Sequence, residues 1–513
     1  MHRDIRDVLV VGGGDVGMLT ALSLRKVDED LRIRIVDDFD SPPPRVGKST
    51  YLAIMPLLHG FLDIEEKSFV QEVKPVWKGS IWFRNWVGQP DFHYPFDDGF
   101  PAFEEADRHE LLHSIYREPR MTTSIGEEIV EQRKAAWNYN PRGGGFQRYQ
   151  EVAYHLPIDR FRAFLKDRCE QHGIDLIDDR IEGATVDNHR VESVNAAGRS
   201  YEADLYIDAS GFGRVVRGEF SELEFTNFDL PLDRAVRTAR DRDLKDVIPA
   251  TIVEGRDDGW CWTIDTYDIR DRGFVYASEF TDDETAAKRL LSEVEGDLTR
   301  EELDFYRFRS GFVDEPWVEN HVTIGNAAGF VEPLQSTALT TNLRFAKFLA
   351  YMLNTTGYRL DQKPRSTYNR FFRTSWNNIY SFISIHYKFN DLDTPFWNRV
   401  RSVELPPLAA ELCRIYDEHG LSHYENPKAA MRSDENGSVL TGSPFGKEDF
   451  FHMLTYMGVD SAYHESLEDN ISPSVMERRR ELQTDREARV ADFHDYVEFY
   501  NVMGGEGTVS EMG

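Results

Sequence analysis

The feature that most limits the fold of this chain is a glycine pattern close to its N-terminus. Residues 7–11 read DVLVV, a short apolar run typical of a buried parallel strand, and GGGDVG follows at residues 12–17. A helical pattern continues to about Lys26, and residues 32–36 alternate like a second strand that ends at Asp37. Gly-x-Gly-x-x-Gly in this strand–turn–helix–strand context predicts a Rossmann-type dinucleotide-binding unit.

Each glycine of this pattern has a physical task. Gly12 permits a tight turn, Gly14 lets the backbone approach a pyrophosphate, and Gly17 lets the helix pack closely on the strand. The helix N-terminus offers free N–H groups and a positive dipole to the phosphates. Asp37 lies 20 residues beyond Gly17, a spacing that suits a carboxylate accepting from a ribose hydroxyl. A plain glycine turn without a ligand is the alternative interpretation.

Two further segments favour FAD over NAD as the dinucleotide. DASGFG at residues 208–213 resembles the strand-to-turn segment of many flavin hydroxylases, and GNAAG at 325–329 stands where such proteins usually carry Gly-Asp-Ala. Asn326 replaces the acid, but an amide can still hydrogen-bond to a ribityl chain. We therefore expect an α/β fold: a Rossmann-type FAD domain interleaved with a hydroxylase-like, substrate-side β-sheet.

Composition limits the partners of the chain. The net charge of -30 argues against nucleic acid, because phosphates require a basic face. The 14 Lys against 46 Arg, with 90 acidic residues, favour a salt-adapted protein from a halophilic archaeon, and an ordinary acidic enzyme is the alternative. Three Cys without metal-ligand spacing, no long apolar run and no signal peptide predict a cytoplasmic protein without a metal or membrane segment.

The segment GWCWTID at residues 259–265 carries a family resemblance. Its Trp260-x-Trp262-x-Ile264 resembles the WxWxIP signature of flavin-dependent halogenases, the tryptophan halogenase family, with Asp265 in place of the usual proline. The resemblance implies that both tryptophans flank the flavin and keep substrate away from it. A pair of core aromatics is the alternative, because residues i and i+2 share a strand face.

The segment WKGSIWFRNW at residues 77–86 resembles the stretch around the family's catalytic lysine, which corresponds to Lys78. The resemblance implies that this amine receives hypohalous acid formed at the flavin and delivers electrophilic halogen to an arene. A lysine among strand-like aromatics can also lose its charge by desolvation. A surface lysine with its amine in solvent is the alternative.

FVEPLQSTA at residues 330–338 resembles the family's EPLESTG segment at a helix start. The resemblance implies a halide, chloride or bromide, at Thr337 and Ala338, and a flavin contact at Leu339. Capping of the helix by serine and threonine alone is the alternative. Gln335 stands at the family's second catalytic position, where a glutamate is usual, and it can hydrogen-bond but cannot take a proton.

A second departure lies in the family's GVGE loop, which reads RVGK here, so Lys48 replaces an acid beside the expected flavin. Lys48 can hold phosphate, alter the flavin's redox behaviour or simply be solvated. The two departures leave three functions open: a halogenase for a reactive indole-, phenol- or pyrrole-type arene, a FAD-dependent monooxygenase or oxidoreductase on another small molecule, or a non-catalytic flavoprotein.

The resemblance extends to about residue 400, through FISIHYKFNDLDTPFWNRV at 382–400, and implies a helical cap over the substrate. We expect a FAD-binding body over residues 1–360 and a helical C-terminal cap over 361–513. Reduced FAD then comes from a separate flavin reductase, and a homodimer is one expectation. The predicted FAD contacts are Gly12, Gly14, Asp15, Val16, Gly17, Asp37, Val46, Lys48, Ser49, Ile181, Asp208, Gly211, Gly325, Asn326 and Leu339.

Overall fold

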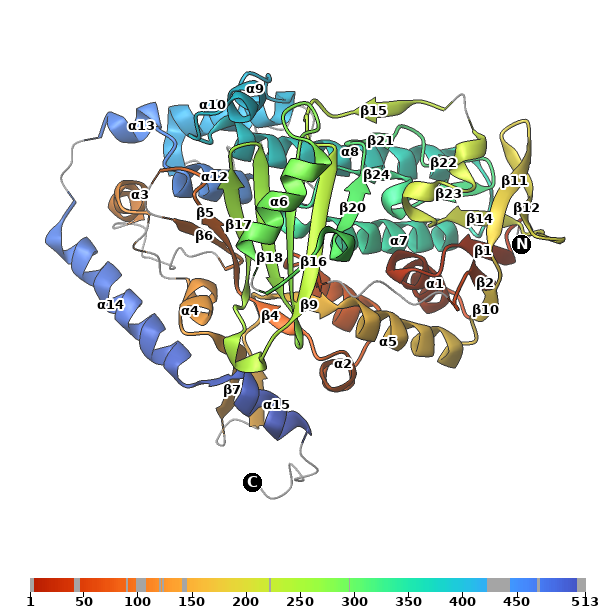
Figure 1. Ribbon diagram of the computed structural model, residues 1–513, viewed down its shortest axis with the longest axis horizontal. Helices are drawn as coiled ribbons and strands as arrows, with labels where there is room; N and C mark the ends of the chain where they lie inside the picture. Colours follow the sequence, from red (N-terminus) through yellow and green to blue (C-terminus); the bar gives the residue numbers. More distant parts are fainter. Residues whose placement is uncertain are drawn as a thin grey trace.

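The structure is a computed structural model of the chain, drawn in Figure 1. It describes residues 4–40, 47–88, 91–97, 108–119, 121, 124–140, 145–220, 223–294, 296–421, 443–467 and 471–504. Val46, one of the predicted FAD contacts, lies outside the described residues. Within these ranges, no helix has both the length and the apolar character needed to cross a bilayer.

The N-terminal pattern forms the centre of a mainly parallel sheet. Its strands run in the order β10 (Asp175–Asp178), β2 (Arg32–Asp37), β1 (Asp7–Val11), β14 (Leu205–Asp208), β23 (His321–Thr323) and β22 (Trp317–Val318). The apolar β1 pairs in parallel with β2 on one side and β14 on the other, so it is buried from both edges. Helix α1 (Asp15–Val27) connects β1 to β2 and packs against α5 (Ile158–Gln171) and α7 (Ala338–Thr355). The predicted Rossmann unit is confirmed.

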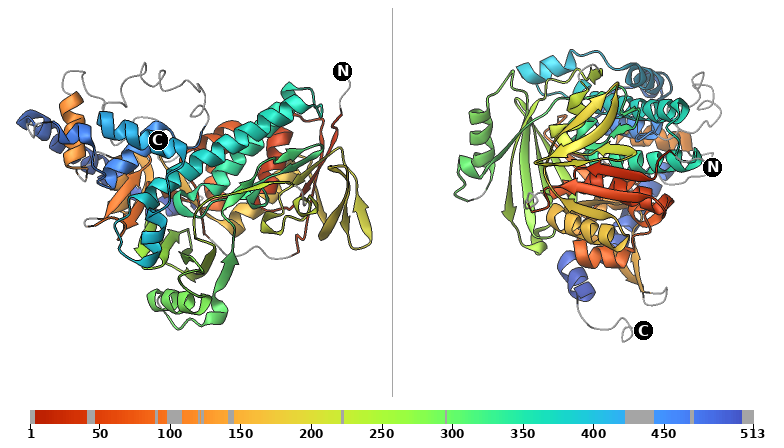
Figure 2. Two further views of the ribbon diagram at one scale, coloured as in Figure 1. Left: turned by 90° about the horizontal axis from the view of Figure 1, so that it is seen from above. Right: turned by 90° about the vertical axis from the view of Figure 1, so that its right-hand side faces the viewer.

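A larger, mixed sheet carries the tryptophan motif. Its strands run in the order β20 (Asp304–Arg307), β16 (Arg234–Asp241), β19 (Ile269–Tyr276), β18 (Gly259–Asp265), β17 (Ala250–Arg256), β5 (Ser80–Arg84) and β6 (Phe92–Pro95). Chain segments inserted after β2 and after β14 both contribute to it, so the two sheets are interleaved in sequence. Figure 2 shows its light-green strands beside the red strands of the Rossmann sheet.

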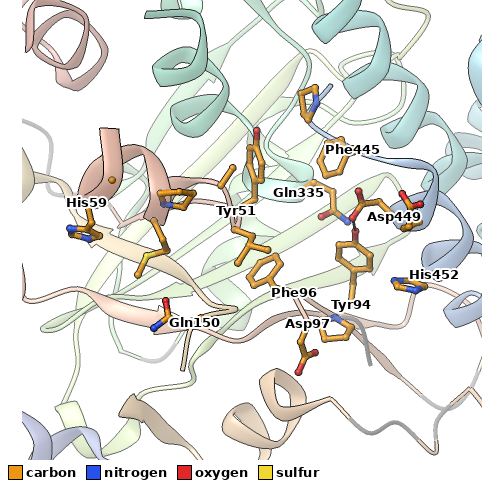
Figure 3. Close-up of a pocket in the computed structure, with 18 of the residues that line it drawn as sticks. Tyr51, His59, Tyr94, Phe96, Asp97, Gln150, Gln335, Phe445, Asp449 and His452 are labelled. Carbon is orange, nitrogen blue, oxygen red and sulfur yellow. Dashed lines mark hydrogen bonds between the residues drawn. The ribbon is translucent and has the colours of Figure 1, made fainter. Parts of the chain in front are cut away.

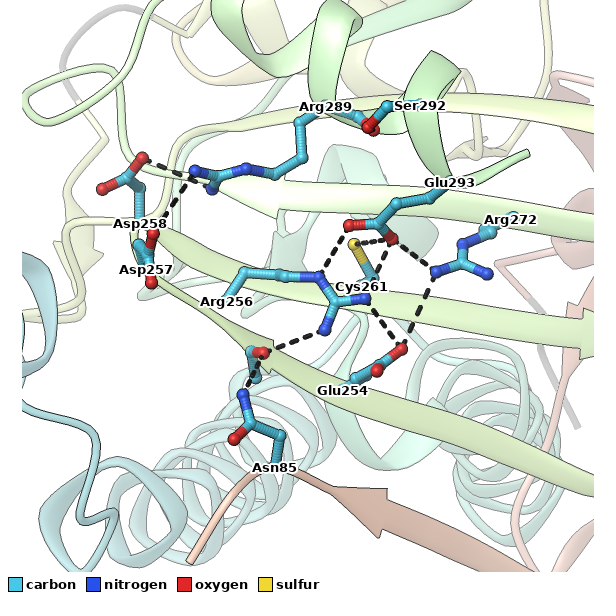
Figure 4. A network of polar contacts seen from close by, with 11 residues as sticks. Asn85, Glu254, Arg256, Asp257, Asp258, Cys261, Arg272, Arg289, Ser292 and Glu293 are labelled. Atoms are coloured by element: carbon cyan, nitrogen blue, oxygen red, sulfur yellow. Dashed lines mark hydrogen bonds and ion pairs between the residues drawn. The ribbon is translucent and has the colours of Figure 1, made fainter.

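An ion network fastens helix α6 (Asp283–Glu293) to the larger sheet (Figure 4). The Arg256 guanidinium forms two bonds of 2.8 and 2.9 Å to the Glu293 carboxylate and lies 2.8 Å from Glu254. Arg272 also pairs with Glu293. Burial raises the pKa of the neighbouring Cys261 thiol to about 12, so this thiol stays protonated. The network is structural and holds no reactive thiolate.

Four three-stranded sheets complete the body within the described residues. They are β11 (Ile181–Asp187), β12 (Arg190–Ala196) and β13 (Arg199–Tyr201); β15 (Phe225–Asn227), β21 (Gly311–Val313) and β24 (Gly329–Phe330); β25 (Phe493–Asp495), β7 (Lys134–Asn140) and β8 (Gly145–Arg148); and β3 (Gly47–Ser49), β9 (Ala153–Pro157) and β4 (Val76–Lys78). In the last sheet β9 lies between β3 and β4, with Ser49 opposite His155 and Lys78 opposite Ala153. This register brings β3 and Lys78 to one site.

The helical region is built around the 27-residue helix α8 (Gln362–Lys388). Further helices among the described residues are α2 (Glu66–Val73), α3 (Arg108–Arg117), α4 (Ile125–Glu131), α9 (Pro395–Arg401), α10 (Pro407–His419), α12 (Lys447–Tyr456), α13 (Ala462–Glu465), α14 (Pro473–Ala491) and α15 (Tyr496–Gly504), with a π-helical turn at Pro56–Phe61. After α14 the chain returns to the body, where β25 pairs with β7 and Tyr496 donates to the Trp77 carbonyl at 2.9 Å. The C-terminal segment therefore supports the strand that carries Lys78.

Candidate active site

The glycine turn after β1 has the shape that a pyrophosphate needs. Gly12 has a φ of +107°, and a Cβ there would lie 2.6 Å from the Ala209 carbonyl. A Cβ on Gly17 would lie 1.9 Å from the Gly12 carbonyl, which explains the close packing of α1. A Cβ on Gly14, in contrast, would meet nothing within 4 Å. The space beside Gly14 and the N-terminus of α1 together fit the pyrophosphate of a dinucleotide.

Charged side chains surround this turn. One Asp37 oxygen accepts from the Gly13 N–H at 2.8 Å and lies 3.9 Å from Arg162, while the side chain stays 32% exposed and open to a ribose hydroxyl. Lys48 forms an ion pair with Asp15 in the first turn of α1. Lys48 is thus not simply a solvated side chain, because its amine is paired at the N-terminal end of α1.

The other predicted FAD positions lie on the turns beside the fingerprint. Gly211 and Gly325 have φ values of +68° and +72°, and a Cβ on Gly325 would lie 3.4 Å from Val16. Both oxygens of Asp208 accept from the turn that follows, including the Arg217 N–H at 2.7 Å, so its carboxylate shapes that turn. Three further predicted FAD positions are described by their packing and burial. Ile181 packs beside β1 and β2, Asn326 is half-buried, and Leu339 is buried in the first turn of α7.

Lys78 is fully buried, so the alternative of a solvent-facing lysine is wrong. Its Nζ lies within hydrogen-bond distance of Ser49 Oγ at 2.9 Å, the Thr50 carbonyl at 3.0 Å and Ser336 Oγ at 3.1 Å. A neutral amine can donate two of these bonds and accept the third from a serine hydroxyl. Desolvation lowers the pKa of Lys78 well below its ordinary value, and no acidic side chain among the described residues offsets this. Nζ also lies 5.2 Å from the centre of the Phe96 ring. The site therefore favours a neutral, nucleophilic amine.

The segment before α7 has an unusual backbone. Gln335 and Ser336 both have positive φ, 65° and 57°, a conformation that costs non-glycine residues free energy and is found at functional sites. Thr337 occupies the N-cap of α7 but makes no side-chain cap bond. The Ser336 hydroxyl bonds to Ser49 and Lys78 instead. The capping alternative is thus wrong, and the uncapped N–H groups at Thr337, Ala338 and beyond suit an anion.

The two tryptophans of the motif are buried but have different partners. Trp260 donates from Nε1 to Tyr387 Oη at 2.9 Å and to Glu332 at 3.1 Å. Burial raises the pKa of Glu332 to about 8. Trp262 donates to Asp271 at 2.7 Å, and the same carboxylate accepts from the Gly47 N–H at 3.2 Å. Trp262 therefore helps to anchor β3, while Ile264 packs at its edge.

A cavity of about 660 Å³ is lined by Phe96, whose ring lies beside the Lys78 amine, and by Gln335, the neighbour of Ser336 (Figure 3). Tyr51, Tyr94, Phe96 and Phe445 give it aromatic walls, and Gln335 lies among them. Acidic groups also line it: Asp97, Glu448 and Asp449. Its size and aromatic lining suit a small aromatic molecule.

His386 is a site residue in the family-like segment at 382–400, from which the sequence predicted only a helical cap. It is fully buried, and its Nε2 lies 2.8 Å from Nε2 of Gln335, 51 positions away along the chain. Trp376 on the same helix, Tyr387 and Trp397 are also buried among aromatic rings. The sequence signal that could have drawn attention to His386 was the HY pair in the family-like segment. No local sequence pattern, however, predicts that His386 contacts Gln335.

Comparison with known proteins agrees with this geometry. The sequence profile described as tryptophan halogenase matches residues 7–473. The chain is 28% identical over 444 residues to tryptophan 7-halogenase RebH of Lentzea aerocolonigenes, covering 81% of this chain and 82% of that protein. Among solved structures it is similar to MibH, a tryptophan 5-halogenase (TM-score 0.82, 25% identity, 99% and 95% covered). BrvH, a flavin-dependent halogenase of Brevundimonas sp. BAL3, shares the fold (TM-score 0.81, 23% identity, 97% and 99% covered).

Proposed function

The chain belongs to the tryptophan halogenase family, and we propose that it halogenates an electron-rich aromatic substrate with reduced FAD, O2 and a halide ion. The observation that carries the proposal is the buried Lys78 amine. The amine is held between Ser49 and Ser336. Ser49 lies on β3, whose Lys48 pairs with Asp15 beside the dinucleotide turn, and Ser336 follows Gln335 of the aromatic cavity. A buried amine without an acidic partner has no evident structural purpose, since its desolvation costs stability.

Residues around the glycine turn are proposed to hold the cofactor. The N-terminus of α1 and Lys48 bind the pyrophosphate, and Asp37 accepts from the ribose. When bound, reduced FAD would supply two of the four electrons that O2 accepts, and the halide would supply the other two and become hypohalous acid. The uncapped N-terminus of α7 at Thr337 and Ala338 is proposed to hold the chloride or bromide ion.

Lys78 is the proposed catalytic residue for halogen transfer. Its neutral amine holds hypohalous acid by a hydrogen bond, or forms an N–halogen bond with loss of water, and passes the halogen as an electrophile to the arene. Because Gln335 cannot remove the ring proton, the favoured substrates are phenol- or pyrrole-type arenes, or reactive indoles, whose cationic intermediate is stabilised by its own heteroatom. A separate flavin reductase is the proposed source of reduced FAD.

The test is an assay with FAD, a flavin reductase, NADH and bromide or chloride, using a panel of phenols, pyrroles and indoles. Brominated or chlorinated product detected by mass spectrometry supports the proposal. Hydroxylated product would instead indicate a monooxygenase, and hydrogen peroxide without any modified substrate a non-catalytic flavoprotein. Lys78→Met should abolish halogenation, whereas Lys67→Met, at an exposed site on α2, should leave it unchanged.

A further inference from the structure

The hydrogen bonds of His386 define which of its nitrogens carries the proton. Nδ1 lies 2.7 Å from the Phe382 carbonyl, which can only accept, so Nδ1 must be the protonated nitrogen. Nε2 then presents a lone pair to the Gln335 side chain at 2.8 Å. Only the amide nitrogen of Gln335 can donate to that lone pair, so the orientation of the amide follows from the imidazole.

The surroundings keep this imidazole neutral. His386 packs against the rings of Phe83 and Phe382, at centroid distances of 5.6 and 4.9 Å, and is fully buried. Burial lowers the pKa of His386 to about 3. His386 is not itself in the wall of the cavity, whereas Gln335 is. The amide nitrogen is therefore drawn to the side away from the cavity.

We propose that His386 is a positioning residue that turns the Gln335 amide so that its Oε1 serves the cavity as a hydrogen-bond acceptor. This inference rests on the proposed function and narrows its substrate class. An acceptor beside the aromatic walls selects a neutral arene that carries its own donor, the O–H of a phenol or the N–H of an indole or pyrrole. It disfavours arenes whose heteroatom is methylated, because the buried Oε1 would lose its partner.

The pair also explains why a glutamate does not suit this position in this chain. A carboxylate 2.8 Å from an imidazole lone pair would place two acceptors face to face in a desolvated site. Such a pair is stable only after it binds a proton. Replacing the amide therefore needs a compensating change at His386, and the two positions are expected to behave as a unit.

The first test measures melting temperature against pH and needs no catalysis. In Q335E the carboxyl group should have a raised pKa in the folded state, so the stability that depends on its proton is present at low pH and lost as pH rises. Q335E should therefore lose melting temperature relative to wild type between about pH 5 and 8. In Q335E/H386Q a glutamine amide can donate to the carboxylate, and most of this pH dependence should disappear.

The groups around this position are common to all the variants, so comparison with wild type removes their own titration. Those that share the cavity wall with Gln335 are Tyr51, His59, Tyr94, Asp97, Arg148, Glu448, Asp449 and His452, and Lys78 bonds to the neighbouring Ser336. A Q335E variant whose stability follows wild type at every pH would overturn the assigned tautomer. A double variant as pH-dependent as Q335E would overturn the pairing.

The second test uses indole and 1-methylindole as binding probes of the FAD-loaded protein, measured by calorimetry. Wild type should bind indole up to about tenfold more tightly, the worth of one hydrogen bond. H386L should reduce this ratio towards one, and H386Q, which can still accept from the amide, should retain it. A ratio unchanged in H386L would refute the positioning role. Failure of halogenation in wild type would instead refute the proposed function, and leave both tests of the pair valid.

Discussion

Lys78→Met is the substitution that tests the central feature of the site. Methionine has a similar length but no amine, so halogen transfer should fall by at least about a hundredfold to ten-thousandfold, the range for loss of a catalytic group. Consumption of reduced FAD by O2 should continue, because the dinucleotide turn is untouched. The substitution should also change the free energy of unfolding, and the pH dependence of this change distinguishes a buried neutral amine from a charged lysine.

The size of that effect follows from the contacts of Nζ. Its three hydrogen bonds, at about 1 kcal/mol each, sum to about 3 kcal/mol that the variant loses. Ser49 keeps a partner in Thr251 at 2.8 Å, so only the Thr50 carbonyl is left without its donor. Removal of the desolvated amine offsets this loss, because burying such a group is itself costly. At neutral pH the variant should therefore be destabilised by less than about 3 kcal/mol.

The direction in which the stability difference between wild type and K78M changes with pH follows from the pKa of Lys78. In the unfolded chain a lysine stays protonated up to about pH 10.4. Since burial lowers the pKa of Lys78 in the folded protein, the unfolded state binds more protons between the folded pKa and that value. The stability of wild type relative to K78M should therefore rise with pH in this window, by at most about 1.4 kcal/mol per pH unit.

Melting temperatures of both proteins, measured between about pH 6.5 and 9.5, check this expectation. The difference between wild type and K78M should move in favour of wild type as the pH increases. The matched control K67M should show no such trend, because its lysine is exposed. A difference that stays flat or moves the other way would mean that Lys78 remains charged in the folded protein, and the reasoning for a neutral nucleophile would be wrong.

Two predictions concern the dinucleotide site. Lys48→Ala removes the counterion of the Asp15 carboxylate at the proposed pyrophosphate site, so FAD affinity, measured by fluorescence titration, should fall about tenfold. FAD affinity should recover in D15N/K48A, and no recovery would contradict a charge effect. Gly17→Ala would place a Cβ 1.9 Å from the Gly12 carbonyl, so flavin should no longer co-elute with the protein in gel filtration, whereas Gly218→Ala, whose Cβ meets nothing within 4 Å, should retain it. Equal flavin retention by both glycine variants would refute the close packing of α1.

Sequence alone determined those features of this protein that depend on residues close together along the chain. The strand, glycine turn and helix that begin the Rossmann unit follow from spacing within about 30 residues, because turn geometry and helix packing depend on near neighbours. Lys78, Gln335 and the tryptophan motif were found differently, from the resemblance of short segments to motifs of a known family. Their chemistry was not determined by those segments.

Tertiary structure alone decided the state of those residues. The burial of Lys78 depends on β9, which holds β3 and β4 side by side, and on C-terminal aromatics such as Tyr496 that close over Trp77. The pairs Lys48–Asp15 and Gln335–His386 join positions 33 and 51 residues apart. The charge of a side chain, the tautomer of a histidine and the direction of a hydrogen bond depend on the groups that tertiary packing brings into contact. Local sequence patterns do not predict those contacts.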